Sequence, residues 1–170
     1  DPKLRYRIFE AQGTAHYYSL RPMEAHRSYS RALDWAQRLE DGATLAIAHT
    51  NLAMACRRLC DWAAARSHYN QAIVAHEAMQ RERDAAVART GLGNVLLDEG
   101  CLSEAFECFD HALRAFRSSP DHRREAGVLY NQGLARLLQG DPVSARALLQ
   151  DALQKFCDLR LTLYAARAHA

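Results

Sequence analysis

Apolar residues recur along this chain with a period of forty residues. Aligning the chain with itself at that shift gives two columns of alanine. They are Ala25, Ala65, Ala105 and Ala145, and Ala32, Ala72, Ala112 and Ala152. Larger apolar residues fill two more columns, Tyr29, Tyr69, Phe109 and Leu149, and Leu33, Ile73, Leu113 and Leu153. Such a period indicates a chain built from repeated structural units.

Within each unit these four columns lie at i, i+4, i+7 and i+8, which is the spacing of one apolar stripe on an α-helix. We assign this helix as the second of a pair. The first helix carries a small residue in every unit, at Gly13, Ala53, Gly93 and Gly133. Small residues let two helix backbones approach closely. The pattern therefore predicts helix pairs and an all-α fold.

Turn-forming residues separate the two helices inside a unit. Gly100 and the run Gly140-Asp141-Pro142 fall at this place in the third and fourth units, and Arg21-Pro22 does so in the first. Proline suits the first turn of a helix, where its missing N–H has no partner to lose.

Between units, turns are expected near Asp41-Gly42 and Ser118-Ser119-Pro120-Asp121, where Ser or Asp can accept hydrogen bonds from the free N–H groups of the next helix. The run Arg81-Glu82-Arg83-Asp84 is a weaker break between the second and third units.

The repeated motif resembles the tetratricopeptide repeat family, most clearly in GLGNVLLDEGCLSEAFECFDHALRAF at 91–116. The copies at 131–153 and 51–73 are also clear, and the first copy is the most degenerate. The resemblance covers essentially the whole chain. It implies a right-handed α-solenoid of antiparallel helix pairs in a single domain, 1–170, with four repeats plus the first helix of a fifth. We place the repeats at approximately 6–45, 46–85, 86–125 and 126–165.

The forty-residue length exceeds the roughly 34 residues of the usual repeat. Extended versions of this kind resemble those of bacterial signalling and transcription regulators, and those of eukaryotic scaffold proteins that bind extended peptides. The chain begins with Asp1 and ends in LTLYAARAHA, inside a helical pattern. We expect it to be a fragment of a longer, bacterial protein.

Composition narrows the class of partner. The 22 basic and 20 acidic residues are interspersed and give a net charge of +2, so no strong field gathers nucleic acid or anionic lipid. No apolar run approaches the roughly 18–20 residues that span a bilayer. The five cysteines are odd in number and lie in helical patterns, which argues against a disulfide framework and for a reducing compartment. We expect a cytoplasmic protein.

Stacked helix pairs leave a concave surface lined mainly by the first helix of each pair. The residues expected there are polar, aromatic or otherwise not needed for the core. By helical phase they are Tyr17, Tyr18, Asn51, Met54, Arg57, Arg58, Asn94, Asp98, Tyr130 and Asn131.

Asn51 and Asn131 are equivalent by the repeat, and Asn94 lies three residues after the third equivalent position. An Asn amide donates and accepts hydrogen bonds at once, so spaced amides can hold the backbone of an extended peptide. The resemblance implies such an Asn ladder. The alternative is that these residues cap or bridge neighbouring helices. Likewise Arg57 and Arg58 either pair with an acidic ligand group or form a solvated helix face.

Metal binding and catalysis have little support. His49, Cys56 and Cys60 share a helix face, but the spacing lacks a paired C-x-x-C, and Cys56 falls in a core column beside Leu96. His68 and Cys108 are column mates on neighbouring second helices, and the same reasoning applies to them. No acid–base arrangement and no phosphate-binding loop is evident. We expect no metal, no cofactor and no enzymatic activity in this segment.

The leading hypothesis is a protein-interaction module that holds a protein or peptide in its groove, as the regulatory or scaffold part of a larger bacterial signalling protein. The alternative is a small-molecule-sensing regulatory domain of a transcription factor or second-messenger enzyme. Self-association through the apolar last helix, 161–170, is a third hypothesis.

Overall fold

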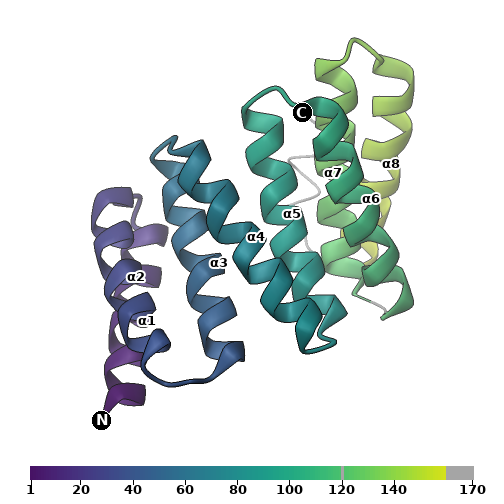
Figure 1. Ribbon diagram of the computed structural model, residues 1–170. Helices are drawn as coiled ribbons and strands as arrows, with labels where there is room; N and C mark the ends of the chain where they lie inside the picture. The colour runs from purple at the N-terminus through teal and green to yellow at the C-terminus, as the bar shows by residue number, and fades with distance from the viewer. Residues whose placement is uncertain (120, 160–170) are drawn as a thin grey trace.

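The computed structural model describes residues 1–119 and 121–159, and all regular structure within these ranges is helical. In chain order the helices are α1 (Pro2–Tyr18), α2 (Pro22–Gln37), α3 (Gly42–Arg58), α4 (Trp62–Ala78), α5 (Glu82–Asp98), α6 (Leu102–Ser118), α7 (His122–Leu138) and α8 (Pro142–Asp158). Consecutive helices form antiparallel pairs that stack in chain order (Figure 1). The predicted all-α solenoid is confirmed.

Two details of the prediction need comment. The pairs begin at residues 2, 42, 82 and 122, four residues before the predicted repeat starts at 6, 46, 86 and 126. The difference corresponds to the first turn of each first helix, which precedes the apolar columns from which the repeats were placed. The predicted fifth helix, and with it the self-association through residues 161–170, lies outside the described residues.

The alanine columns mark where helices touch. Ala25, Ala65, Ala105 and Ala145 have no exposed surface, and the second alanine column is equally buried. Tyr29 and Phe109 are buried beside them, whereas Leu149 in the last pair is only partly buried. The core therefore follows the forty-residue columns, and it loosens at the last described pair.

Glycines in the first helices accept the large side chains of the second helices. A Cβ built on Gly13 would lie 2.4 Å from the Tyr29 ring, one on Gly93 would lie 2.5 Å from the Phe109 ring, and one on Gly133 would lie 2.7 Å from Leu149. Real Cβ atoms do not approach so closely, so a hydrogen is the only side chain that fits while these neighbours keep their places.

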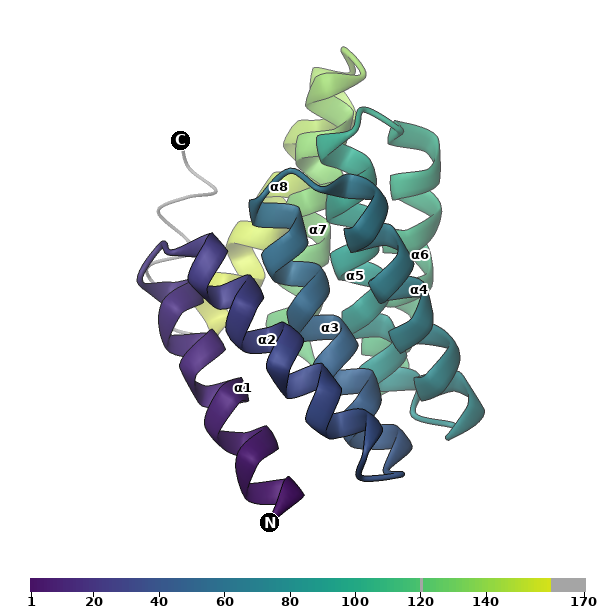
Figure 2. The ribbon, with the colours of Figure 1, turned by 60° about the vertical axis from the view of Figure 1, so that its left-hand side comes forward.

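The first helices also contact one another along the stack, α1 with α3, α3 with α5, and α5 with α7. Successive pairs are rotated, so that α1 and α2 run obliquely to α5 and α6 (Figure 2). This arrangement places the first helices next to each other on one side of the stack, as the sequence predicts for a groove.

Aspartates cap many of the helices. The carboxylate of Asp41 accepts from the Ala43 N–H at 3.1 Å, that of Asp61 from Ala64 at 3.1 Å, and that of Asp141 from Ser144 at 3.0 Å. These bonds satisfy N–H groups that have no partner within the helix. The predicted weak break at 81–84 has no such cap, because Arg81 stands at that position.

Among the described residues, turns with a positive φ end helices every twenty residues from 20 to 100, and again at 140. Gly100 has φ of 80° and Gly140 of 77°, while Leu20, Glu40, Cys60 and Gln80 have φ between 52° and 59°. This left-handed conformation costs an L-residue about 1–2 kcal/mol, and glycine adopts it freely.

We expect Gln80→Gly to raise the free energy of unfolding by about 0.5 kcal/mol, because relief of the left-handed strain exceeds the extra chain entropy of glycine. Gly100→Ala is the matched opposite, and it should lower the free energy of unfolding by about 1 kcal/mol. Urea denaturation of both variants measures the two changes. Shifts of the same sign would contradict the assignment of strain to these turns.

Candidate functional site

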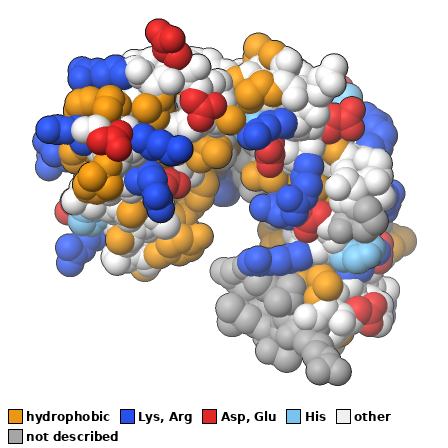
Figure 3. All heavy atoms as spheres, turned by 90° about the horizontal axis from the view of Figure 1, so that it is seen from below, with side chains coloured by type: hydrophobic (Ala, Val, Ile, Leu, Met, Phe, Trp, Pro, Cys, Tyr) orange, Lys and Arg blue, Asp and Glu red, His pale blue; other side chains and the backbone are white. Residues whose placement is uncertain are grey.

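A cavity of about 520 Å³ opens on the side of the stack formed by the first helices. Six of the ten predicted groove residues line it: Tyr17, Met54, Arg57, Asn94, Tyr130 and Asn131. We call this cavity the groove. Seen from below, the described residues curve around a hollow that is bordered by Lys and Arg side chains (Figure 3). The binding role of the six residues stays a prediction.

The other four predicted residues, Tyr18, Asn51, Arg58 and Asp98, do not line the groove. Tyr18 is 77% exposed at the end of α1. Asn51 is half-buried on α3.

Arg58 and Asp98 instead join neighbouring pairs. The Arg58 Nε donates to the Tyr17 hydroxyl at 3.3 Å, and its guanidinium lies 5.1 Å from the centre of the Tyr17 ring. The Arg57 Nε donates to Asp98 at 2.6 Å. Arg57 and Arg58 therefore each contact the pair before or after their own, while Arg58 stays exposed.

The groove contains residues that sequence analysis did not select. Thr50 and Thr90 lie one repeat apart in the column of Tyr130, and Arg123 and Arg124 come from the start of α7. Second helices contribute three buried aromatic residues to its floor, Tyr69, Phe116 and Phe156. The repeat spacing of Thr50, Thr90 and Tyr130 was a usable signal. The aromatic residues carried none, because they also fit core columns.

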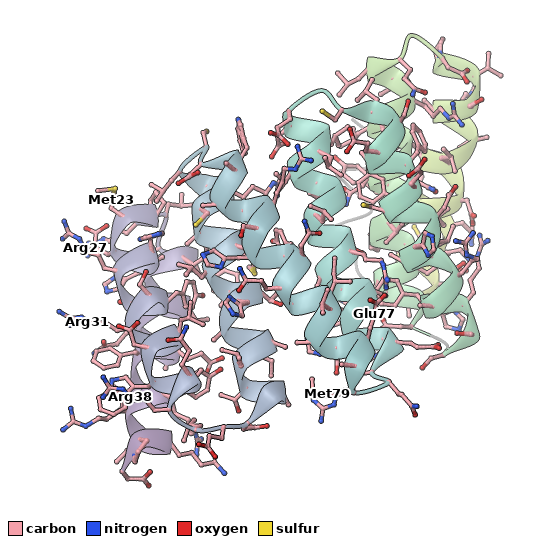
Figure 4. The ribbon with its side chains drawn as sticks, in the orientation of Figure 1. Met23, Arg27, Arg31, Arg38, Glu77 and Met79 are labelled. Carbon is pink, nitrogen blue, oxygen red and sulfur yellow. The ribbon has the colours of Figure 1, made fainter. Side chains whose placement is uncertain are left out.

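The charge of the groove is one-sided. Among the described residues that line it, Arg57, Arg123 and Arg124 are cationic and none is Asp or Glu. Arg124 donates from Nη1 to Asp121 at 2.7 Å, so Arg57 and Arg124 each have a carboxylate partner behind the lining. By contrast, Arg27 and Arg31 point outward from α2, away from the stack (Figure 4).

Tyr69 stands out among the lining residues. It is 3% exposed, and a Cβ built on Gly91 would lie 2.3 Å from its ring and 2.7 Å from its hydroxyl oxygen. Burial raises the pKa of Tyr69 well above its ordinary value, an effect that outweighs the opposing charge of Arg57. The hydroxyl therefore stays protonated and able to donate a hydrogen bond at physiological pH.

The candidate metal residues are separated by the fold. Cys56 is buried and Cys60 is exposed, and within residues 1–119 and 121–159 no three His, Cys, Asp or Glu side chains gather as a metal site would require. Burial raises the pKa of the Cys56 thiol to about 11, which disfavours the thiolate that metals bind.

The imidazole of His49 contacts the imidazole of His68 rather than a cysteine. Their Nδ1 atoms are 3.1 Å apart and their rings are stacked, with centroids 5.2 Å apart. Burial, together with the nearby His68, lowers the pKa of His49 to about 4. The pair is therefore neutral at physiological pH, with one imidazole donating to the other.

The match to a family model decides the classification. The model of the tetratricopeptide repeat matches residues 6–78 and 84–157. The chain belongs to the tetratricopeptide repeat family. No curated protein sequence matches this tetratricopeptide repeat chain.

Several solved structures share its fold. BtubC (BKLC) from P. vanneervenii is 20% identical, with a TM-score of 0.81 over 94% of this chain and 66% of that chain. A Rap protein complexed with Competence and Sporulation Factor is 18% identical, with a TM-score of 0.90 over 99% and 47%. Aspartyl phosphate phosphatase F from Bacillus subtilis is 15% identical, with a TM-score of 0.90 over 99% and 44%. At these identities the likeness shows the fold alone.

This tetratricopeptide repeat chain thus spans between 44% and 66% of the length of those three proteins. Within its described part, no helix is long and apolar enough to cross a membrane.

Proposed function

We propose that the chain is a protein-interaction module that holds an extended segment of a partner protein in the groove. The observation that carries this proposal is the position of Asn94 and Asn131, which both line the groove and come from the neighbouring first helices α5 and α7. Their amides can pair with the N–H and C=O groups of an extended backbone, which has both to satisfy.

The chemistry of the lining supports binding rather than catalysis. The described residues that form the groove include no Asp, Glu, His, Cys or Lys, which are the usual general acids, bases and nucleophiles. Family membership and the neighbour solved with Competence and Sporulation Factor support an interaction role. We further propose a cytoplasmic module that forms the regulatory or scaffold part of a larger bacterial signalling protein.

A small molecule is the second candidate occupant. The groove volume of about 520 Å³ falls within the roughly 300–1,000 Å³ of typical ligand pockets. The buried aromatic floor would suit a compact ligand. Peptide binding should depend on both Asn94 and Asn131, whereas a small molecule has no repeating backbone for these two side chains to hold.

We expect the double variant Asn94→Ala/Asn131→Ala to weaken peptide binding at least about tenfold, since each lost amide removes about 1 kcal/mol of hydrogen bonding. The probe is a fluorescein-labelled decapeptide selected on the wild-type chain from a random phage-displayed library, and the readout is fluorescence anisotropy. Asn70→Ala, on the exposed face of α4, is the matched control and should leave affinity unchanged. An equal affinity for wild type and double variant would place the peptide outside the groove.

A further inference from the structure

The repeat is broken at two places, one in the second pair and one in the third. The column that holds Asn51 and Asn131 has Gly91 in the third pair, and the column of close-packed glycines has Ala53 in the second pair. Gly91 therefore interrupts the Asn ladder at the middle of the groove. Ala53 brings a methyl group to a place where the other three pairs have only a hydrogen.

The packing of Tyr69 differs from that of its column mates. In the other pairs the equivalent side chain packs on the glycine of its own first helix, as Tyr29 does on Gly13 and Phe109 on Gly93. The Tyr69 ring instead packs on Gly91, which belongs to the next pair. Any side chain at position 91 would occupy the space of this ring. The glycine at 91 and the position of Tyr69 thus require each other.

The Tyr69 hydroxyl reaches the groove without a partner. The equivalent hydroxyl of Tyr29 donates to Thr14 Oγ1 at 3.2 Å. Within residues 1–119 and 121–159, the Tyr69 hydroxyl makes no hydrogen bond, although the residue is 97% buried and lines the groove. Among the described residues, the buried side-chain polar atom that lacks a partner is His76 Nδ1, so the unpaired Tyr69 hydroxyl is open to the groove and available to a ligand.

The surroundings of this hydroxyl favour an anionic acceptor. The groove lining contains three arginines and no carboxylate among its described residues, while Asp98 and Asp121 outside the lining pair with Arg57 and Arg124. Arg57 is close enough to Tyr69 to act on its ionisation. A phenol that stays protonated donates a strong hydrogen bond to a carboxylate. Carboxylates in a protein partner come from Asp and Glu side chains.

We propose that the Tyr69 hydroxyl donates a hydrogen bond to an Asp or Glu side chain of the bound peptide, at the place where Gly91 interrupts the Asn ladder. Tyr69 is then a specificity-determining residue, and the groove selects acidic extended segments over neutral ones. This inference rests on the proposed function, since it requires that a peptide occupies the groove.

The test is a double-mutant cycle between Tyr69 and the peptide. The probes are an acidic decapeptide selected from a random phage-displayed library on the wild-type chain and the same peptide with each Asp and Glu changed to Asn and Gln. Y69F should weaken the acidic decapeptide about tenfold, as expected for a lost hydrogen bond to a charged group. It should weaken the amide version about twofold or less, because a neutral acceptor gains less from the hydroxyl.

Y29F is the matched control, since it removes the equivalent hydroxyl from the same column. We expect it to leave both affinities unchanged and to lower Tm by about 3 °C through loss of the bond to Thr14. Y69F should leave Tm within about 1 °C of wild type, because its hydroxyl bonds no other described residue. A Tm loss for Y69F as large as that for Y29F would overturn the proposal.

The outcomes distinguish failure of the role of Tyr69 from failure of the proposed peptide-binding function. If the peptides depend on Asn94 and Asn131 but Y69F weakens acidic and amide versions equally, or neither, the role of Tyr69 is wrong and the proposed function stands. The same holds if selection yields peptides without acidic residues. If no peptide is selected, or if a uridine decanucleotide binds more tightly than any peptide, the proposed function fails and the role of Tyr69 fails with it.

Discussion

Gly93→Ala is expected to lower the free energy of unfolding by about 3 kcal/mol, the upper end of the cost of overpacking a core by one methyl group. The added Cβ would lie 2.5 Å from Cε1 of Phe109, which has no exposed surface. In the second pair, Ala53 is tolerated because Tyr69 packs across on Gly91. Phe109 has no such route, because the position equivalent to Gly91 in the following pair is Asn131.

Gly127→Ala is the control for this prediction. Gly127 also lies inside a first helix, but nothing lies within 4 Å of a Cβ built there. Alanine should therefore raise the free energy of unfolding by about 1 kcal/mol through its better helix propensity. Urea denaturation followed by circular dichroism compares both variants with wild type. A gain in stability for Gly93→Ala would show that the Phe109 ring can move aside, and the close-packing argument would then be wrong.

The architecture could be predicted from the sequence because the same helix-contact pattern occurs in each of the four repeats. Columns such as Ala25, Ala65, Ala105 and Ala145 have no exposed surface, as close helix contact requires. Alanine at a helix contact is a local requirement, so it recurs independently in each of the four copies. The helix pairs begin one helical turn before the approximate repeat starts, because the apolar columns used to place the repeats do not mark where a helix begins.

The groove was only partly predictable. Helical phase selects the residues on one face of one helix, and this reasoning found Asn94, Tyr130 and Asn131. It does not give the rotation between successive pairs, and that rotation brings Arg58 to Tyr17 and Arg57 to Asp98, each 41 residues apart. Tyr17 and Arg57 consequently join neighbouring pairs as well as line the groove.

Tyr69 was missed for a different reason. Tyr69 falls in the same column as Tyr29 and Phe109, and we assign every residue of a column the same role, which here is packing in the core. The signal that separates Tyr69 from them lies elsewhere, in the coincidence of Ala53 and Gly91 as exceptions to their own columns. Departures from a repeat are therefore as informative about function as the repeat is about fold.

The start of α7 depends on a buried carboxylate that no periodicity predicts. Glu125 is 5% exposed and occupies the column of Leu45 and Ala85. It accepts from the Arg117 Nε at 3.1 Å and lies 3.3 Å from the Lys155 Nζ. These contacts connect the end of α6, the start of α7 and the end of α8. They also fix the helix that brings Arg123, Arg124, Tyr130 and Asn131 to the groove.

Burial alone would raise the pKa of Glu125, but the hydrogen bonds from Arg117 and Lys155 outweigh burial and hold that pKa below its ordinary value of 4.5. A folded-state pKa below the unfolded one means that the carboxylate stabilises the fold above about pH 4.5, and that this contribution is lost as pH falls through the folded-state pKa.

We expect Glu125→Gln to lower the free energy of unfolding by about 2 kcal/mol at pH 7, since it removes charge-assisted hydrogen bonds at a buried site whose cationic partners are partly exposed. Urea denaturation at pH 7 and at steps below pH 4.5 should show the gap between wild type and variant closing as the wild-type carboxyl becomes protonated. Glu104→Gln is the control, because Glu104 is 59% exposed and lies 3.8 Å from Arg66, a pair of the kind that contributes at most about 0.5 kcal/mol. A gap for Glu125→Gln that stays constant from pH 7 to pH 3 would mean that packing, and not the charge of Glu125, holds α7 in place. The groove would then keep its shape in acid, and peptide binding by Asn131 would not share the pH dependence of stability.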